Sequence, residues 1–170
     1  MYEVGDFVLK ANTGVCKVVN ISNPNILGID RSKMYYQLMP VDNDKAKVYV
    51  PIENAYSTIR KIITVEEAMK LIEQIDEIEI IKVANDKVRQ QKYKEMLRTG
   101  NPRELIQIIK TTYLRKKERL EQGKKNTASD ESYLKLAEKQ LFSELSVVLN
   151  KSNEEIHRLI MMAVNKNKES

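Results

Sequence analysis

The side chains that most often carry out chemistry are scarce in this sequence of 170 residues. It has one histidine, His157, and one cysteine, Cys16. Neither has a partner for nucleophilic catalysis at motif spacing, because His157 stands beside Arg158 in a helical segment and Cys16 follows Val15 in an expected strand. We interpret His157 as surface or rim packing and Cys16 as a small buried apolar residue. One histidine and one cysteine also fall short of a zinc site.

The carboxylates and glycines give no catalytic pattern either. The acidic residues between positions 64 and 81 fall at helix starts and on polar faces, where they match the helix dipole instead of lining a pocket. The five glycines are isolated from one another, so there is no glycine-rich phosphate loop. We predict a protein that is not an enzyme, with no catalytic residue, no metal, no cofactor and no small-molecule substrate.

A basic span is the strongest chemical signal. Residues 82–125 hold 14 basic and 5 acidic residues, a net charge of +9, whereas the whole chain carries +5. Such a local excess attracts a polyanion. Cations near an expected helix N-terminus gain further attraction for phosphate from the helix dipole and backbone N–H groups. The candidate nucleic-acid contacts are Lys87, Arg89, Lys92, Arg115, Lys116, Lys117 and Arg119.

A solvated helix face is the alternative interpretation of this span. The charge run from 115 to 119 covers more than one helical turn, so its side chains point in several directions and some only keep the helix in solution. Nothing in the sequence supports base-specific recognition.

The first third of the chain is expected to form β-strands, so any site in it would be positioned by a sheet. Alternating apolar residues and turn clusters predict four strands, with room for a fifth, at Phe7 to Leu9, Val15 to Ile21, Met34 to Val41 and Lys47 to Ile52. Strands of this length and spacing predict a small barrel. Pro51 cannot donate a ladder hydrogen bond, so the fourth strand ends there or lies at a sheet edge that can accept a partner's strand.

From Thr64 onward the hydrophobic period changes from that of strands to that of helices. Thr64 and Glu67 have the form of a capping box, and further starts are expected at Asn85 or Asp86, at Asn101-Pro102, near Ser129 and at Ser152. Gly100 and Gly123 mark two stops. The sequence therefore predicts an α+β protein of two domains, a barrel over 1–62 and an all-α bundle of about five helices over 63–170.

No stretch of the sequence predicts membrane insertion. The longest apolar run, Leu159 to Val164, is far shorter than the roughly 20 residues that a membrane helix needs. Glu3 and Asp6 interrupt any signal-peptide core. We expect a cytoplasmic protein without a membrane partner.

Several motifs together resemble the CarD family (CarD/CdnL) of bacterial RNA-polymerase-binding transcription regulators. The opening Val4-Gly5-Asp6-Phe7-Val8 with Gly14-Val15 is similar to the start of that family, and Ala137, Leu141 and Glu144 are similar to its helical part. The most specific similarity is Val50-Pro51-Ile52-Glu53-Asn54-Ala55, and the resemblance extends over nearly the whole chain.

The resemblance implies a fold, partners and sites. It implies a Tudor-like N-terminal barrel, shared with transcription-repair coupling factor, that binds the β subunit of RNA polymerase, and a helical domain that contacts promoter DNA. Its polymerase-facing positions correspond here to Ile26 with Leu27, Tyr49 and Pro51. It also implies nucleoid association through the polymerase.

The chain departs from the family pattern at three places. The stretch Leu9 to Gly14 replaces a Tyr-Pro-x-His-Gly motif, and Pro24 and Tyr49 stand where relatives carry arginine. The family inserts a tryptophan into DNA at the start of the second helix, where this chain has Asp86 and no tryptophan anywhere.

These observations leave three functional hypotheses. The first is an accessory transcription regulator that docks on the polymerase β subunit through the barrel and holds promoter DNA non-specifically through its basic helices. The second is a polymerase- or protein-binding adaptor whose basic face never meets DNA. The third, an RNA-associated module, rests only on the barrel and the charge.

Overall fold

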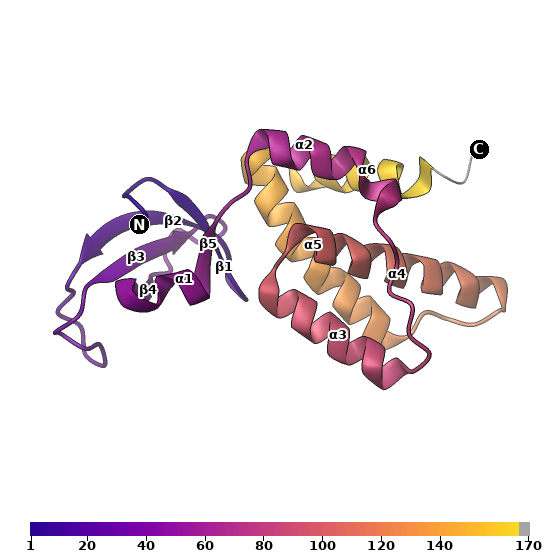
Figure 1. The fold of residues 1–170 in the computed structure, drawn as a ribbon, viewed down its shortest axis with the longest axis horizontal. Helices are drawn as coiled ribbons and strands as arrows, with labels where there is room; N and C mark the ends of the chain where they lie inside the picture. The colour runs from indigo at the N-terminus through magenta and orange to yellow at the C-terminus, as the bar shows by residue number, and fades with distance from the viewer. Residues whose placement is uncertain (167–170) are drawn as a thin grey trace. The chain divides into compact units, whose positions relative to one another are not determined.

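The computed structural model describes residues 1–166 of the chain (Figure 1). It separates into two compact units, one spanning Met1–Ile63 and one beginning at Thr64. Each unit has its own core, and each is described below by itself.

The first unit is a curled, five-stranded antiparallel sheet. Its strands are β1 (Phe7–Lys10), β2 (Gly14–Ser22), β3 (Tyr35–Pro40), β4 (Val48–Pro51) and β5 (Ile59–Lys61), in the order β4-β3-β2-β1-β5. The register of β2 against β3 shifts between Val18 and Asn20, and an irregularity of this kind bends a strand and increases its twist. The concave side encloses a core of Val8, Cys16, Val18, Tyr36, Leu38, Val50, Ala55 and Ile59.

The sheet is open, so the predicted barrel is corrected to a half-barrel, and the Tudor-like fold stays a prediction. β4 pairs only with β3 and β5 only with β1, which leaves one free edge on each. The four predicted strands are present, and β5 is the strand that was not located in the sequence. Its three residues are too few to display an alternating pattern.

A short helical segment connects the edge strand β4 to β5. After Pro51, η1 (Ile52–Asn54) and α1 (Ala55–Thr58) follow without a break. Ala55 and Ile59 turn into the sheet's core, so this segment covers part of its open side. The prediction that Pro51 lies at an edge is confirmed.

The second unit is helical throughout. Its elements are α2 (Val65–Glu73), η2 (Ile75–Glu77), α3 (Asp86–Thr99), α4 (Pro102–Glu121), α5 (Ala128–Leu149) and α6 (Asn153–Asn165). Residues 1–166 thus form six α-helices, where about five were predicted for the bundle. The extra helix is the single turn α1 in the first unit, which is too short to produce a helical hydrophobic stripe.

Side-chain caps explain where the helices of the second unit begin. Thr64 and Glu67 form the predicted capping box, and the side chain of Ser152 accepts a hydrogen bond from the backbone N–H of Glu155. At α3 the cap is Asn85, whose Oδ1 accepts from the N–H of Lys87 at 2.8 Å, so Asp86 is the first helical residue and not the cap. At α5 the cap is Thr127, two residues before Ser129.

The core of the second unit is built from one stripe of each helix. Leu105, Ile108 and Ile109 of α4 are buried as predicted, while Tyr113 lies at the rim. The other fully or nearly buried apolar residues are Ala68, Leu71, Ile75, Ile78, Ile81, Tyr93, Leu97, Ile106, Ala137, Leu141, Phe142, Leu145, Ile156 and Ile160. The 3 and 4 spacing of these residues is the reason that the helices could be recognised in the sequence.

Candidate functional site

The free edge of β4 presents backbone groups at one residue in particular. The backbone N–H of Ile52 donates to the carbonyl of Met34 at 3.0 Å, so that pair is of the hydrogen-bonded type. Along an antiparallel ladder, hydrogen-bonded pairs alternate with pairs that exchange no backbone hydrogen bond. Counting back from Ile52, Val50 and Tyr36 therefore form a hydrogen-bonded pair, and Tyr49 and Gln37 form a pair without hydrogen bonds. The N–H and C=O of Tyr49 therefore face away from β3.

Pro51 has the same outward orientation as Tyr49. Its missing N–H would have faced the free edge, so the proline removes no hydrogen bond from the existing ladder. The carbonyls of Tyr49 and Pro51 and the single N–H of Tyr49 are the groups that this stretch offers to an added strand. The side chains of both residues are partly exposed.

A second apolar feature of the first unit is the loop that contains Ile26 and Leu27. The side chain of Leu27 is 93% exposed and that of Ile26 is also exposed. The loop is held by local hydrogen bonds: Asn23 Nδ2 donates to the carbonyl of Arg31, and Asp30 accepts from the N–H and hydroxyl of Ser32. These two hydrogen bonds lower the pKa of the Asp30 carboxyl below its usual range.

An ion pair ties the end of this loop to the segment after β4. Lys33 Nζ lies 2.5 Å from Glu53 Oε1, and the neighbouring Met34 accepts the backbone hydrogen bond from Ile52. The hydrogen bond to Glu53 raises the pKa of the Lys33 ammonium. The structure thus connects the exposed Ile26–Leu27 loop to the edge strand that carries Tyr49 and Pro51.

In the second unit, α3 carries a straight row of exposed cations. Lys87, Lys94 and Arg98 follow one another at i, i+7 and i+11, which places them on one face of the helix over about 16 Å of its axis. All three are exposed, as is Lys92 on the flank. Lys94 and Arg98 were absent from the predicted contacts, although their spacing from Lys87 was visible in the sequence.

Arg89, by contrast, is buried. Its side chain is 8% exposed and its guanidinium pairs with the carboxylate of Asp86, three residues earlier. Residues i and i+3 share a helix face, and this face turns toward Tyr93 and the bundle. Arg89 is therefore not on the surface that the charge count assigned to nucleic acid.

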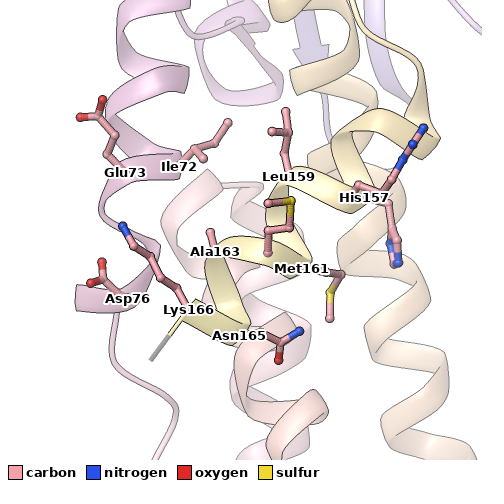
Figure 2. Close-up of a pocket in the computed structure, with 11 residues that line it drawn as sticks. Ile72, Glu73, Asp76, His157, Leu159, Met161, Ala163, Asn165 and Lys166 are labelled. Carbon is pink, nitrogen blue, oxygen red and sulfur yellow. The ribbon is translucent and has the colours of Figure 1, made fainter. Parts of the chain in front are cut away.

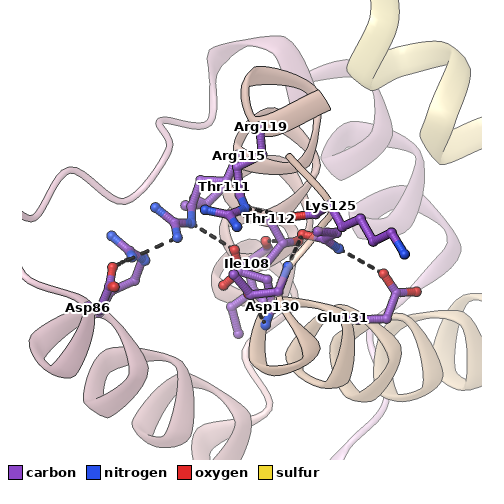
Figure 3. Close-up of polar contacts among 12 residues, drawn as sticks. Asp86, Ile108, Thr111, Thr112, Arg115, Arg119, Lys125, Asp130 and Glu131 are labelled. Carbon is purple, nitrogen blue, oxygen red and sulfur yellow. Dashed lines mark hydrogen bonds and ion pairs between the residues drawn. The ribbon is translucent and has the colours of Figure 1, made fainter. Parts of the chain in front are cut away.

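Arg115 likewise pairs with acidic residues of the neighbouring helices (Figure 3). Its Nε donates to Asp130 Oδ2 at 2.8 Å, and its Nη2 lies 3.8 Å from Asp86 Oδ1. The Asp130 side chain is 5% exposed, and Arg115 is the cation that pairs with this buried carboxylate. Asp86, Arg115 and Asp130 form a chain of charges that joins α3, α4 and α5.

A tyrosine lies next to this charged chain. Tyr93 is fully buried beside the ring of Tyr133, and its hydroxyl has no hydrogen-bond partner within residues 1–166. Burial, with the negative charge of Asp130 as a second cause, raises the pKa of Tyr93 to about 12. The phenol is therefore neutral at physiological pH.

Two further cations are engaged with backbone carbonyls. Arg119 Nε donates to the carbonyl of Lys125 at 2.8 Å and holds the loop between α4 and α5 (Figure 3). Lys110 Nζ donates to the carbonyls of Ile75 and Ile78, at 2.8 and 2.6 Å, and burial lowers its pKa. Part of the net +9 therefore stabilises the fold instead of facing solvent.

Four of the predicted nucleic-acid contacts are exposed or partly exposed and their side chains take no part in the contacts described above, whereas those of the partly exposed Arg115 and Arg119 do. Lys87, Lys92 and Lys117 are exposed and Lys116 is partly exposed. Lys87 and Lys92 both lie on α3 but point about 140° apart around its axis, and only Lys87 shares a face with Lys94 and Arg98. Lys116 and Lys117 lie on α4.

Cys16 and His157 lie apart from these surfaces. Cys16 is buried in the sheet's core, and burial raises the pKa of its thiol to about 11. His157 is exposed and packs edge-to-face on Phe142, with ring centroids 5.7 Å apart. Within residues 1–166 no three side chains of the metal-ligating types come together, and no helix of that part is both long and apolar enough to cross a membrane.

Comparison with known proteins identifies the family of both units. Residues 2–63 match the CarD-like/TRCF RID domain, and residues 67–161 match the CarD C-terminal domain. No curated protein matches the chain. The two matches follow one another along nearly the whole sequence, and the residues between them, 64–66, are those with which the capping box of Thr64 opens α2. The chain belongs to the CarD family.

Proposed function

We propose that this protein is an accessory transcription regulator that binds the β subunit of RNA polymerase through its first unit and the backbone of promoter DNA through its second. Membership of the CarD family supports interaction with RNA polymerase and a regulatory, non-enzymatic role. The single observation that carries the proposal is the free edge of β4, which is open at Tyr49. The ion pair between Lys33 and Glu53 ties the loop of the exposed Ile26 and Leu27 to the segment that follows β4.

The polymerase contact is strand addition. A partner strand laid against β4 accepts from the N–H of Tyr49 and donates to the carbonyls of Tyr49 and Pro51, and these backbone bonds give affinity without regard to side chains. Leu27 and Ile26 then add apolar contact to one side of the added strand. The side chain of Tyr49 contributes a partly exposed aromatic anchor, a residue type common at the centres of interfaces.

The DNA contact is electrostatic. Lys87, Lys94 and Arg98 lie on one exposed helix face, where they neutralise phosphates without reading bases. The second hypothesis, an adaptor that never meets DNA, keeps the β4 contact and leaves this row of cations to solvent.

A proline substitution at position 49 tests the polymerase contact. Tyr49→Pro removes the outward N–H and disturbs no hydrogen bond to β3, so the sheet keeps its ladder while strand addition loses its only donor in this stretch. Tyr49→Phe is the matched control, because it keeps the backbone N–H and the aromatic ring. Binding of the full chain to purified RNA polymerase is measured by biolayer interferometry.

We expect Tyr49→Pro to weaken polymerase binding by at least about tenfold while Tyr49→Phe stays near wild type, with both variants retaining the wild-type circular dichroism spectrum. Equal binding by a folded Tyr49→Pro variant contradicts strand addition at this edge. Duplex binding by the same proteins separates the regulator from the adaptor, since the adaptor hypothesis requires no salt-dependent affinity for DNA.

A further inference from the structure

Helix α3 is attached to the rest of the second unit by few buried apolar side chains. Of its 14 residues, Tyr93 and Leu97 are the buried apolar ones, at 0% and 8% exposed, and Met96 is half-buried. Tyr93 packs on the ring of Tyr133, with centroids 5.1 Å apart. The third buried residue of α3 is the charged Arg89. A helix of this length is marginal in water without packing against a core, so α3 depends on a small apolar contact.

Helix α6 has nearly the same length and shows how a more firmly packed helix differs. Of its 13 residues, Ile156 and Ile160 are fully buried. Four more apolar residues are half-buried, and the first three of them line the groove between α6 and α2 (Figure 2): Leu159, Met161, Ala163 and Val164. The buried residues of α6 include no charged side chain in the described part of the chain. Less apolar surface therefore holds α3 than holds α6.

The ion pairs around α3 are arranged so that the buried Arg89 and Asp130 keep their partners when the helix is released. Asp86 and Arg89 both lie on α3, so their ion pair moves with the helix. Arg115 and Asp130 lie on α4 and α5, so their 2.8 Å pair stays behind. Asp86 also lies 3.8 Å from Arg115, but its side chain is 78% exposed, and an ion pair in contact with water contributes little to stability.

The hydroxyl of Tyr93 also favours release. It is buried without a hydrogen-bond partner within residues 1–166. A buried donor without a partner carries a cost in free energy, and that cost disappears when the group reaches water. The docked position of α3 therefore carries a penalty at the same residue whose ring is its fully buried apolar contact.

The chain before α3, in contrast, is held firmly by α4. We call residues 75–81 the strap, and three of its residues are at most 9% exposed: Ile75, Ile78 and Ile81. Lys110 Nζ donates to the carbonyls of Ile75 and Ile78, at 2.8 and 2.6 Å. The backbone N–H of Ile81 donates to Thr111 Oγ1 at 2.9 Å in the interior. The strap therefore belongs to the core that α4 forms, up to and including Ile81.

Positions that can act as hinges lie at both ends of α3. Lys82, Ala84 and Asn85, between the strap and α3, are exposed and lie outside helices and strands. At the other end Gly100 closes the helix with a φ of 67°, and the next residue, Asn101, caps α4. Short segments of this kind absorb the dihedral changes that a moving element requires.

We infer that α3 is a conformational switch: residues 86–99 leave α4 and α5 and unfold as one unit, while the strap, α4 and α5 keep their folded contacts. The opened state brings the Tyr93 hydroxyl and the Arg89 guanidinium into water. Lys87, Lys94 and Arg98 form a row only while α3 is helical, so the switch decides whether that surface exists. The inference goes beyond the proposed function, because the opening requires neither polymerase nor DNA.

Native-state hydrogen exchange of the full chain, followed by NMR over a series of low urea concentrations, tests the switch. We expect the amides of residues 90–99 to share one opening reaction and to exchange at least about tenfold faster than those of Ile81 and Ile109. Their exchange should depend on urea, but less steeply than that of Ile81 and Ile109, because opening α3 exposes less surface than unfolding the whole unit.

Two variants separate the release of α3 from unfolding of the whole unit. Tyr93→Phe removes the hydroxyl that lacks a partner and keeps the ring, so it should slow exchange of the α3 amides by at least about fivefold. Tyr56→Phe, at an 85% exposed tyrosine of the first unit, is the matched control and should change nothing. Lys110→Met removes hydrogen bonds of the strap, which stays closed when α3 opens. It should speed exchange at Ile81 by at least about fivefold and leave the α3 amides unchanged.

Several results overturn the inference. They are exchange of the α3 amides together with Ile81 on one urea curve, exchange of the α3 amides that does not depend on urea, equal acceleration of α3 and Ile81 by Lys110→Met, or no slowing by Tyr93→Phe. The urea curves of the wild type decide by themselves where a variant does not fold. Neither polymerase nor DNA is present in the measurement, so failure here is distinguishable from failure of the proposed function.

Discussion

Arg115 and Asp130 form a 2.8 Å ion pair that joins α4 to α5, and the aspartate side chain is 5% exposed. Burial makes the two partners unequal. Asp130 has almost no access to water, whereas the arginine side chain is 27% exposed and also lies near Asp86. Loss of the arginine therefore leaves a buried charge, while loss of the aspartate leaves a cation that can reach solvent.

Arg115→Gln is predicted to lower the free energy of unfolding of the second unit by about 2–3 kcal/mol. A fully buried pair costs about 3–5 kcal/mol when one partner is removed, and the partial exposure of Arg115 reduces that figure. Lys117→Gln, two residues away and exposed, is the control and should change it by less than about 0.5 kcal/mol. Urea unfolding followed by circular dichroism measures both free energies. Equal losses in Arg115→Gln and Lys117→Gln would show that the Arg115–Asp130 ion pair does not contribute to stability.

Duplex binding by the full chain is predicted to be weak, indifferent to sequence and steeply dependent on salt. Neutralising 4 to 5 phosphates gives a log–log slope of about −3 to −5. Changing Lys94 or Arg98 to Gln should each reduce the slope by about 0.9, because each removes one exposed cation from the row on α3. Lys139→Gln, on α5, is the matched control.

Arg89→Gln, measured in the same salt titration of duplex binding, tests whether a buried cation contributes to the salt dependence. Because Arg89 is buried against Asp86, its loss should lower stability and leave the slope of the folded protein unchanged. A slope that fell for Arg89→Gln and not for Lys94→Gln would mean that another face of α3 meets DNA.

Asp86→Trp is predicted to lengthen the lifetime of the open promoter complex if the family's aromatic insertion operates at this position. An inserted aromatic ring replaces part of the lost base stacking at a DNA step. The substitution costs about 1–2 kcal/mol of stability, because Arg89 loses its charged partner. It does not cost a helix cap, since Asn85 holds that place.

Asp86→Asn is the control that removes the charge without adding a ring. Open-complex dissociation is measured for wild type and both variants with purified polymerase. An equal increase in open-complex lifetime with Asp86→Asn would assign the effect to the loss of negative charge. An unchanged lifetime with Asp86→Trp would show that an aromatic ring at this position does not stabilise the open complex.

Stability is predicted to fall between about pH 9 and pH 11 because of Cys16. Burial raises the pKa of the folded thiol to about 11 from an ordinary value of 9.0, so the folded state holds its proton more tightly than the unfolded state. The stabilisation is complete below pH 9 and is lost as the pH rises toward 11, by up to about 2–3 kcal/mol. Cys16→Ala lacks this ionisation, so the difference between its unfolding free energy and that of wild type should shrink across this window.

The strength of the sequence signals explains which parts of the structure could be predicted. The capping box at Thr64 and the proline after Asn101 were recognisable because each cap uses neighbours in the chain. The choice between Asn85 and Asp86 could not be made, since both residue types cap helices and only the ion pair of Asp86 with Arg89 gives the aspartate another role.

The candidate surfaces show the same limit. Charge counts located the basic region but did not separate two engaged arginines from the solvent-facing Lys87 and Lys92. Arg89 is itself buried and pairs with Asp86, whereas Arg115 pairs with the buried Asp130. A helical projection would have found Lys94 and Arg98. The open edge of the sheet depends on pairings between strands, which alternation within one strand does not specify.

Pro51 also has a consequence for the protein when no partner is present. A free strand edge is a template on which identical chains can stack. Here a strand added at Tyr49 finds no donor at Pro51, so fewer hydrogen bonds hold it along this edge. A backbone edge with fewer donors is a weaker template for pairing with a second copy of the chain.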